Sequence, residues 1–389
     1  MVSFDELKQY RYIVIGLDHY NPLGVVRGFG MNGIKPVLIV KKRTADAPRM
    51  ASASKYVDKL HEVDSFDELP ELLLSHYADK EKRPFVYPCD DVATGVLDRN
   101  YDRLKDYFCI ENCGEQGRLE HFKQKTVLLE AATRNGLNVP RLWDLQDGIP
   151  DDIIYPVITK PYKSYEGWKR DYFICNNEEE LKSALEKVSG RVFVQQYIKK
   201  VNELVINGMT YNGGKDNFTS IATLYTYLLP DSFSLEMKVF AFDDADLKNK
   251  IDHLFADIGY NGVYDLECLV DDKNEKWFLE TNFRNSTWSW ASTCLGMNLP
   301  LLWAYAMVNG RIPENTLKSV PEGYIALAEV ADFDQRVKKR HMISVGQWFK
   351  GVLRADCLYY FDKKDMMPIV HIWTKKISNL FLRRKRVKK

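Results

Sequence analysis

A hairpin predicted at residues 263–282 constrains the fold of this chain more than any other local feature. Residues 263–270 and 276–282 have the apolar and β-branched character of strands, and the polar turn DDKN lies between them. Glu267 and Glu280 are about equally distant from this turn, so we expect them to pair across the hairpin. Two opposed carboxylates repel each other, and such a pair is tolerated when a cation lies between them.

The second strand of the hairpin continues this polar pattern. Glu280, Asn282 and Arg284 occupy alternate positions in the stretch WFLETNFR, so their side chains should point to one face. With Glu267 they supply two carboxylates and an amide oxygen, the hard ligands that Mg²⁺ prefers, and Mn²⁺ is also possible. The alternative is a solvated strand face that carries unrelated acids.

The N-terminal residues predict a strand, a helix and a second strand. Residues 13–15 are a β-branched run, residues 21–24 are expected to form a loop, residues 25–29 have helical apolar spacing, and residues 37–40 are the next strand. This order predicts a parallel sheet with helices on both faces. The glycines do not form the G-x-G-x-x-G pattern, so we predict no dinucleotide site.

The chain divides into three parts by its pattern. We expect an N-terminal domain at 1–113, a second domain at 114–315, and a less periodic C-terminal extension at 316–389. The helices expected in the second domain span 122–135, 178–188, 248–258 and 299–308. Its strands are expected at 155–160, 192–198, 204–207, 222–229, 237–242 and in the hairpin.

Composition excludes several classes of protein. With 45% hydrophobic and 28% charged residues, the chain fits a globular protein of two or three domains. It contains no run of about 18 apolar residues, so we expect no membrane-spanning helix, and its N-terminus does not resemble a secretory signal. Seven scattered cysteines without a zinc pattern are typical of thiols in a reducing cytoplasm.

The C-terminal residues are strongly basic. Residues 375–389 carry eight Lys and Arg and no acidic residue, which leaves the rest of the chain acidic, so we expect no nucleic-acid partner. Apolar side chains alternate with these cations over 373–389 at helical spacing, a pattern typical of a helix that lies on an anionic membrane. A solvated, partly disordered terminus is the alternative.

Other polar residues suit a nucleotide. Lys125 in a predicted helix and Lys160 at the end of a strand are candidate phosphate-binding cations. The strand at 192–198 ends in a segment that suits the adenine edge, and Glu203 suits a ribose diol. Each feature alone is also typical of a solvated surface. The residues expected at the adenine are Gln195, Gln196, Tyr197 and Ile198.

Taken in order, these features resemble the ATP-grasp superfamily, which includes D-alanine–D-alanine ligase, biotin carboxylase and carbamoyl phosphate synthetase. Members have a helical lysine, a V-x-K-P strand, a V-Q-E-Y-I hinge and a ribose-binding Glu, then an acid followed about 13 residues later by E-x-N-x-R. The resemblance covers about residues 10–310. The matching positions are Lys125, ITKP at 158–161, VQQYI at 194–198, Glu203, Glu267, ETN at 280–282 and Arg284.

Within the superfamily, the chain is most similar to the carboxylate–amine ligase group, which includes D-aspartate ligases. Four stretches carry this similarity: GVVRGFG at 24–30, ASASKYVDK at 51–59, YPCDDVATGVLDR at 87–99 and YYFDKKDMMPIV at 359–370. The sequence also departs from the family pattern. Gln196 replaces a Glu, Phe283 a Pro and Gln124 an Asp, and the loop at 162–172 contains only Gly167, where the family has a glycine-rich loop over the phosphates.

The resemblance implies an α/β protein with the ATP-grasp fold. An N-terminal parallel-sheet (pre-ATP-grasp) domain would precede a two-lobed α+β ATP-binding region with a lid at about 141–199. It also implies an ATP-dependent carboxylate–amine ligase, which forms an amide through an acyl phosphate and releases ADP. The implied site residues are Lys125, Lys160, Gln195, Gln196, Tyr197, Ile198 and Glu203 for ATP, Glu267, Glu280 and Asn282 for Mg²⁺ or Mn²⁺, and Arg284 and Lys160 for catalysis.

The substrates implied are a small carboxylate and an amine, bound by a cytoplasmic homodimer. An ATP-grasp phosphotransferase with a hydroxyl acceptor and a catalytically silent nucleotide-binding scaffold are the alternatives. The acceptor pocket is expected to involve Ser286, Thr287, Trp288 and Trp290, with Asp18, His19, Asn21, Asp90 and Asp91 across the cleft. For the two tryptophans, core packing is the alternative.

Overall fold

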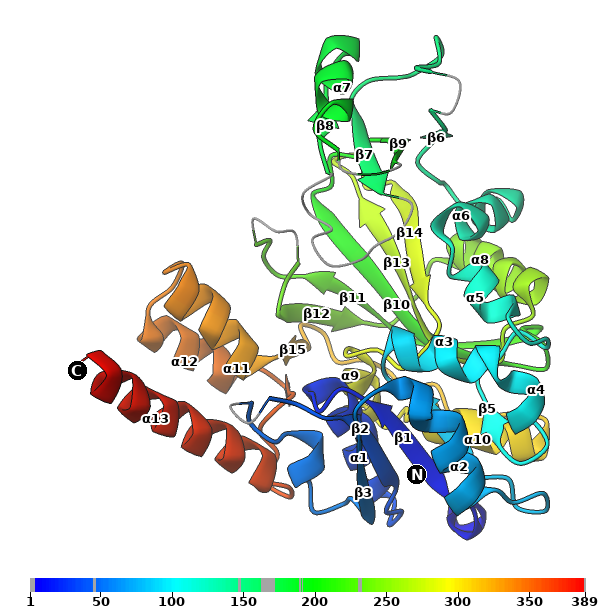
Figure 1. The fold of residues 1–389 in the computed structure, drawn as a ribbon, viewed down its shortest axis with the longest axis vertical. Coiled ribbons are helices and arrows are strands. Elements are labelled where there is room, and N and C mark those ends of the chain that lie inside the picture. The colour runs from blue at the N-terminus through cyan, green and yellow to red at the C-terminus, as the bar shows by residue number, and fades with distance from the viewer. Residues whose placement is uncertain are drawn as a thin grey trace.

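The computed structural model describes residues 4–44, 47–145, 148–161, 172–188, 190, 192–229 and 233–387 of the 389-residue chain. It contains three sheets, which follow one another along the long axis of the molecule (Figure 1). The N-terminal sheet lies at the bottom of this view, a seven-stranded sheet in the middle, and a small four-stranded sheet at the top. Among the helices described, none combines the length and apolar character needed to span a bilayer.

The N-terminal sheet is parallel and covered on both faces, as the sequence predicts. Apolar side chains of helix α1 pack on one face, and those of α2 and α3 pack on the other. The predicted loop at 21–24 is wrong, because α1 already begins at Tyr20. The strands, in sheet order, are β3 (Lys59–Val63), β2 (Val37–Lys41), β1 (Tyr12–Gly16), β4 (Phe85–Pro88) and β5 (Cys109–Ile110). The helices are η1 (Asp5–Gln9), α1 (Tyr20–Met31), η2 (Ala51–Ala53), η3 (Phe66–Glu68), α2 (Leu69–Tyr77), α3 (Asp91–Arg99) and α4 (Tyr101–Leu104).

The small sheet is antiparallel and has a hydrophobic core of its own. Trp143, Val157, Leu181 and Val194 are buried together between the sheet and helix α7. All its elements fall between residues 142 and 196, inside the range expected for a lid. Its strands, in sheet order, are β6 (Leu142–Trp143), β9 (Val192–Gln196), β7 (Val157–Pro161) and β8 (Ile174–Cys175), and α7 spans Glu178–Leu185.

The seven-stranded sheet is the central layer of the molecule. Its strands, in sheet order, are β14 (Lys276–Asn282), β13 (Gly262–Val270), β10 (Asn202–Tyr211), β11 (Asp216–Tyr225), β12 (Glu236–Phe240), β15 (Ile325–Leu327) and β16 (Cys357–Leu358). All neighbours are antiparallel except β15 and β16, which are parallel. Helices α5 (Arg118–Phe122), α6 (Lys125–Arg134) and α8 (Ala245–Ile258) bury one face of this sheet.

The remaining helices lie after the hairpin. They are α9 (Ser289–Cys294), α10 (Leu299–Asn309), α11 (Glu329–Asp332), the π-helix η5 (Phe333–Lys339), α12 (Val345–Arg354) and α13 (Met367–Val387). The division at residues 315 and 316 stays a prediction, although β15 and β16 beyond it extend the central sheet. The basic C-terminal segment is helical as far as Val387.

One predicted helix needs a correction that bears on function. The expected helix at 122–135 begins three residues later, as α6, and Phe122 instead ends the short helix α5. Lys125 is the first residue of α6. Helices α3 and α4 are likewise separate, on either side of Asn100.

A buried arginine connects helix α1 to the segment 359–365 near the C-terminus. Arg27 on α1 is fully buried, and its Nε donates to Asp365 Oδ2 at 3.1 Å. Its two terminal nitrogens donate to the carbonyl oxygens of Tyr359 and Tyr360, each at 3.0 Å. Ser54 Oγ also donates to Asp365 Oδ2, at 2.8 Å. Three of the stretches that resemble carboxylate–amine ligases thus meet in one hydrogen-bonded cluster, the Arg27 clamp.

We predict that Arg27→Met lowers the free energy of unfolding by about 3–5 kcal/mol, because it leaves the buried Asp365 carboxylate without its cation. Urea-induced unfolding measures this change. The matched control is Arg134→Met, which removes an exposed ion pair to Asp257 and should cost about 1 kcal/mol or less. Equal losses in the two variants would contradict the role of the clamp.

Candidate functional site

Acidic and amide side chains from β10, β13 and β14 share one face of the central sheet. Glu267 on β13 is directly opposite Glu280 on β14, which confirms the pairing expected from the hairpin. Two residues before Glu267 on β13, Asp265 lies opposite Asn282 on β14 and opposite Asn207 on β10. Because partners across a ladder point to the same face, these side chains form one polar cluster.

Asp265 is a member of this cluster that the sequence argument missed. Asn282 Nδ2 donates to Asp265 Oδ1 at 2.6 Å and to Glu267 Oε1 at 3.1 Å. The signal was present, because Asp265 lies two positions before Glu267 on the same strand, just as Asn282 lies two positions after Glu280. The two strands therefore carry matching pairs of polar residues.

Burial and mutual repulsion disfavour the charged form of these acids. Burial raises the pKa of Glu267 well above its usual range, and the charges of Glu280 and Asp265 raise it further. Burial likewise raises the pKa of Asp265 to about 6, although the nearby Arg284 cation opposes the shift. A bound cation would relieve both effects.

The donor set fits a hard cation. Glu267 and Glu280 supply carboxylate oxygens side by side, and Asn282 supplies an amide. The amide nitrogen of Asn282 now faces the acids while its Oδ1 accepts from Arg284, so the amide must turn over to present its oxygen. Across the described residues, no three Asp, Glu, His or Cys side chains are arranged as a metal centre, so the candidate ligand set is two carboxylates completed by this amide.

Arg284 is held in place from the N-terminal domain. Its Nε donates to Asp91 Oδ1 at 2.8 Å and its Nη2 to Asp91 Oδ2 at 3.0 Å, a two-pronged pair. Nη2 also donates to Asn282 Oδ1 at 3.1 Å. Asp91 is the first residue of α3, so this ion pair bridges the two domains beside the acidic cluster.

Lys160 lies on the face of the lid sheet that is turned away from the lid's own core. It is opposite Phe193, and Gln195 is opposite Ile158, so these side chains share one face, whereas Val157 and Val194 are buried on the other. Lys160 Nζ donates to Gln195 Oε1. Burial lowers the pKa of Lys160 to about 8, and the charge of Lys125 adds to this effect.

Lys125 begins α6, where the free N–H groups of the first helical turn favour an anion. A cavity of about 540 Å³ opens beside it, between the α5–α6 junction and the lid. The residues that line it are Gly117, Glu120, His121, Gln124, Lys125, Thr126 and Phe193. Two lysines and a helix N-terminus thus lie near one another and are suited to phosphate oxygens.

The expected adenine residues lie at the end of strand β9 in the small sheet and directly after it. Gln196 N donates to the Arg141 carbonyl at 2.8 Å, and Tyr197 N to the Pro156 carbonyl at 2.9 Å, which fixes this segment to β6 and β7. Gln195 and Gln196 point to opposite faces, and Ile198 is half-buried. The expected phosphate-covering loop lies outside the described residues, apart from Tyr172.

Glu203 is buried at the start of β10, and its carboxylate is already engaged. Oε2 accepts from the Tyr225 hydroxyl at 2.5 Å, and Oε1 accepts from Lys200. These two partners fix the carboxylate at the edge of the polar face. A carboxylate oxygen has more than one lone pair, so it can still accept from a hydroxyl group of a ligand.

Three residues expected in the acceptor pocket make contacts that support the fold. Asp18 accepts from the backbone of Met50 and Ser52 and pairs with Arg43 at 3.2 Å. Asp90 caps α3, and Trp290 is buried and donates to the Leu358 carbonyl at 3.1 Å. Their part in an acceptor pocket stays a prediction.

The other residues expected in the acceptor pocket include several that lie near the acidic cluster. Asn21 and Asn285 form a buried amide pair at 2.6 Å that joins the two domains. Ser286 Oγ accepts from Asn207 Nδ2 at 3.0 Å, which places it beside the acidic cluster. The rings of His19 and Trp288 are packed against Tyr20 and Tyr359, at centroid distances of 3.8 Å and 5.3 Å, and Thr287 hydrogen-bonds Tyr20.

We predict that the affinity for a non-hydrolysable ATP analogue falls as the pH rises above about 8, by up to about tenfold per pH unit. Lys160 has a pKa of about 8 in the free protein, and only its protonated form attracts phosphate. Titration calorimetry between pH 6.5 and 9.5 measures the effect.

Lys160→Arg should flatten this profile, because a guanidinium stays charged throughout the range. Lys215→Arg, at an exposed lysine in another part of the chain, is the control and should leave the profile unchanged. A falling profile that persists in Lys160→Arg would show that another group causes it.

Comparisons with known proteins show similarity in part of the sequence and in the fold. No protein-family model matches the chain. Over 173 residues it is 25% identical to a 5-formaminoimidazole-4-carboxamide-1-(beta)-D-ribofuranosyl 5'-monophosphate synthetase of Methanopyrus kandleri. The match covers 44% of each protein, so the chain spans less than half the length of this curated relative.

Solved structures resemble the chain over most of its length. The L-amino acid ligase from Bacillus licheniformis superposes with a TM-score of 0.56 at 14% identity, over 77% of this chain and 74% of that one. The N5-carboxyaminoimidazole synthetase from Staphylococcus aureus gives 0.62 at 12%, over 85% and 86%. The biotin carboxylase domain dimer of Hydrogenobacter thermophilus 2-oxoglutarate carboxylase, in complex with magnesium ADP, ADP and bicarbonate, gives 0.61 at 16%, over 79% and 71%. At these identities the likeness establishes a shared fold.

Proposed function

We propose that this chain, which has the ATP-grasp fold, is an ATP-dependent ligase that joins a small carboxylate to an amine through an acyl phosphate and releases ADP. The observation that carries the proposal is the pairing of Glu267 with Glu280 on the sheet, beside Arg284, together with two lysines on the lid and on α6. Opposed acids and neighbouring cations of this kind suit a metal–nucleotide complex.

The residues divide into two groups around the phosphates. Glu267, Glu280 and Asn282 would hold Mg²⁺ or Mn²⁺, which neutralises negative charge on the phosphate oxygens. Lys125 and Lys160 bind phosphate oxygens from the α6 and lid sides.

Arg284 binds the groups that take part in the reaction. Its planar fork stabilises charge on the transferred phosphoryl group and the acyl phosphate. Asp91 acts as a positioning residue, because it fixes the direction of this fork through both carboxylate oxygens. No covalent protein intermediate is needed, because the substrate carboxylate attacks the γ-phosphorus and the amine then displaces phosphate.

The nucleoside end of ATP is assigned to the lid edge. Backbone groups at Gln195, Gln196, Tyr197 and Ile198 read the adenine, and Glu203 accepts from the ribose hydroxyls. The neutral Gln196 in place of the usual acid is compatible with this assignment, since backbone groups, and not this side chain, form the hydrogen bonds to the adenine. Closure of the lid protects the acyl phosphate from water.

The partners that we propose are small molecules and a second copy of the chain, in the cytoplasm. Support for a dimer comes from the biotin carboxylase domain of the Hydrogenobacter thermophilus enzyme, which forms one. Support for a reducing compartment comes from the seven cysteines, none of which forms a disulfide in the described structure. Membrane contact through residues 373–389 is also proposed, on the basic composition of this segment.

The experiment that tests this function is a screen for ADP and phosphate release with Mg-ATP across amino acids and other small carboxylates, with and without an amine. Release that needs both an acid and an amine supports the ligase. Release with hydroxyl compounds alone would show a phosphotransferase. Nucleotide binding without any release would show a silent scaffold.

We predict that Glu280→Ala lowers turnover at least about 100-fold at saturating Mg²⁺ while the fold survives, because the variant loses a metal ligand on the sheet face. Turnover and Mn²⁺ binding are measured together. Glu275→Ala, at the exposed turn of the same hairpin, is the control and should behave like the parent. Near-normal turnover in Glu280→Ala would rule out the metal assignment.

A further inference from the structure

Helix α12 presents an apolar stripe to solvent. Val345, Phe349 and Leu353, spaced four residues apart, are 58%, 55% and 72% exposed. The helix is attached to the body by its other edge, where Trp348 Nε1 donates to the Glu329 carbonyl at 3.2 Å and Arg354 pairs with Glu236 at 2.7 Å. Its apolar side is therefore turned away from the core.

Helix α13 repeats this arrangement. Ile369 and Ile372 are buried against the core of the molecule. Four other apolar side chains, at spacings of four, three and four residues, form a second, exposed stripe that begins just before the helix and continues along it. They are Met366, Val370, Trp373 and Ile377.

The two helices that carry these stripes are connected through aromatic side chains. The ring of Phe333 on η5 lies 4.8 Å from that of Trp348 and 6.4 Å from that of Trp373, so aromatic contacts link α12 to α13. Both helices lie on the same side of the molecule (Figure 1). We call the exposed residues of the two stripes, with the basic residues around them, the α12–α13 surface.

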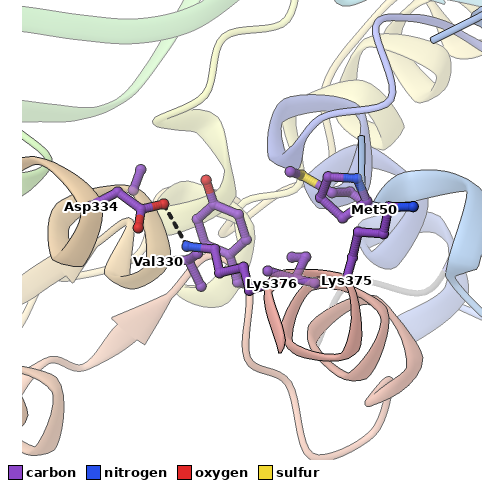
Figure 2. A pocket seen from close by; sticks show the side chains of 9 residues that line it. Met50, Val330, Asp334, Lys375 and Lys376 are labelled. Carbon is purple, nitrogen blue, oxygen red and sulfur yellow. Dashed lines mark hydrogen bonds and ion pairs between the residues drawn. The ribbon is translucent and has the colours of Figure 1, made fainter. Parts of the chain in front are cut away.

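A cavity of about 280 Å³ lies at the base of this surface, between α11, α13 and the segment before η2. Figure 2 shows Met50 and Val330 at its walls and Lys376 beside Asp334. Lys376 Nζ pairs with Asp334 Oδ2 at 2.5 Å, and Lys375 also lines the cavity. The hollow thus combines apolar walls with two lysines.

The charge of these helices differs from that of the rest of the chain. Residues 335–355 and 366–389 together carry 14 Lys and Arg and no Asp or Glu, so the remainder has a net charge of −13. Some of these cations pair with acids of the body: Arg336 with Asp332 and Glu236, Arg354 with Glu236, and Lys338 and Lys376 with Asp334. By composition, these two segments nevertheless carry a large positive excess.

We propose that the α12–α13 surface docks onto an anionic lipid bilayer, with Phe349, Leu353, Trp373 and Ile377 inserted at the boundary between headgroups and acyl chains. Amphipathic helices with basic polar faces and exposed aromatic and aliphatic residues bind such surfaces. This extends the contact proposed for residues 373–389 by adding α12, and it does not depend on the ligase activity.

Charge decides between the possible occupants. A second copy of the chain on this surface would place one set of basic residues against another, which is unfavourable. A nucleic acid would satisfy the cations but would leave the exposed aliphatic side chains without an apolar partner. An anionic bilayer satisfies both the charges and the apolar stripes.

Vesicle sedimentation of the full-length protein tests the proposal, without substrates. Vesicles of phosphatidylcholine alone are compared with vesicles that also contain phosphatidylglycerol. We expect binding to the anionic vesicles only, and weaker binding at high salt. The double variant Phe349→Ser with Leu353→Ser should bind at least about tenfold more weakly, because two inserted side chains are lost. Leu317→Ser, at an apolar residue that is 65% exposed elsewhere, should bind like the parent.

Several outcomes would overturn the proposal. They are the absence of binding to either vesicle, equal binding to both, and undiminished binding by the double variant. Dissociation of a lipid-free dimer in the double variant would instead identify an interface between copies. Truncation to residues 1–374 removes Ile377 and the eight basic residues of 375–389 and should weaken binding as well, and unchanged binding would contradict their part in docking. Far-UV circular dichroism and thermal unfolding show that each variant is folded, and neither measurement depends on the ligase activity.

Discussion

Glu267 and Glu280 are directly opposite each other in the pairing of β13 and β14, so their side chains leave the same face of the sheet as neighbours. Buried repulsion of this kind is relieved by a proton or by a cation. On the other side of the site, burial and the charge of Lys125 lower the pKa of Lys160, which disfavours the charged form of this lysine. A metal–nucleotide complex would bring a cation to the acids and phosphate anions to the lysines.

Contacts between distant segments keep these groups in position. Asp91 comes from the N-terminal domain to orient Arg284, and the Asn21–Asn285 amide pair joins the same two domains nearby. The Arg27 clamp ties α1 to the C-terminal segment through Asp365. The stretches that make the chain similar to carboxylate–amine ligases therefore have a structural explanation, since most of them meet at these junctions.

The sequence predicted what is encoded locally. The hairpin followed from alternation and a turn, and the facing of Glu267 and Glu280 followed from their distance to that turn. The break before Lys125 was missed because no glycine or proline marks it. Strand β16, with two residues, is too short for a local pattern and depends on pairing with β15. Helix α12 was missed because residues 316–389 were treated as one irregular segment. The assigned roles of the site residues stay predictions.

The central claim is that a substrate carboxylate becomes an acyl phosphate between the acidic cluster on the central sheet and the two lysines, Lys125 and Lys160. The most direct measurement uses a carboxylate substrate labelled with heavy oxygen, incubated with Mg-ATP and the amine, followed by mass spectrometry of the released phosphate. The account predicts a single labelled oxygen in each phosphate, because the oxygen that attacks the γ-phosphorus leaves with it when the amine adds. Phosphate without the label, released alongside amide product, would contradict it.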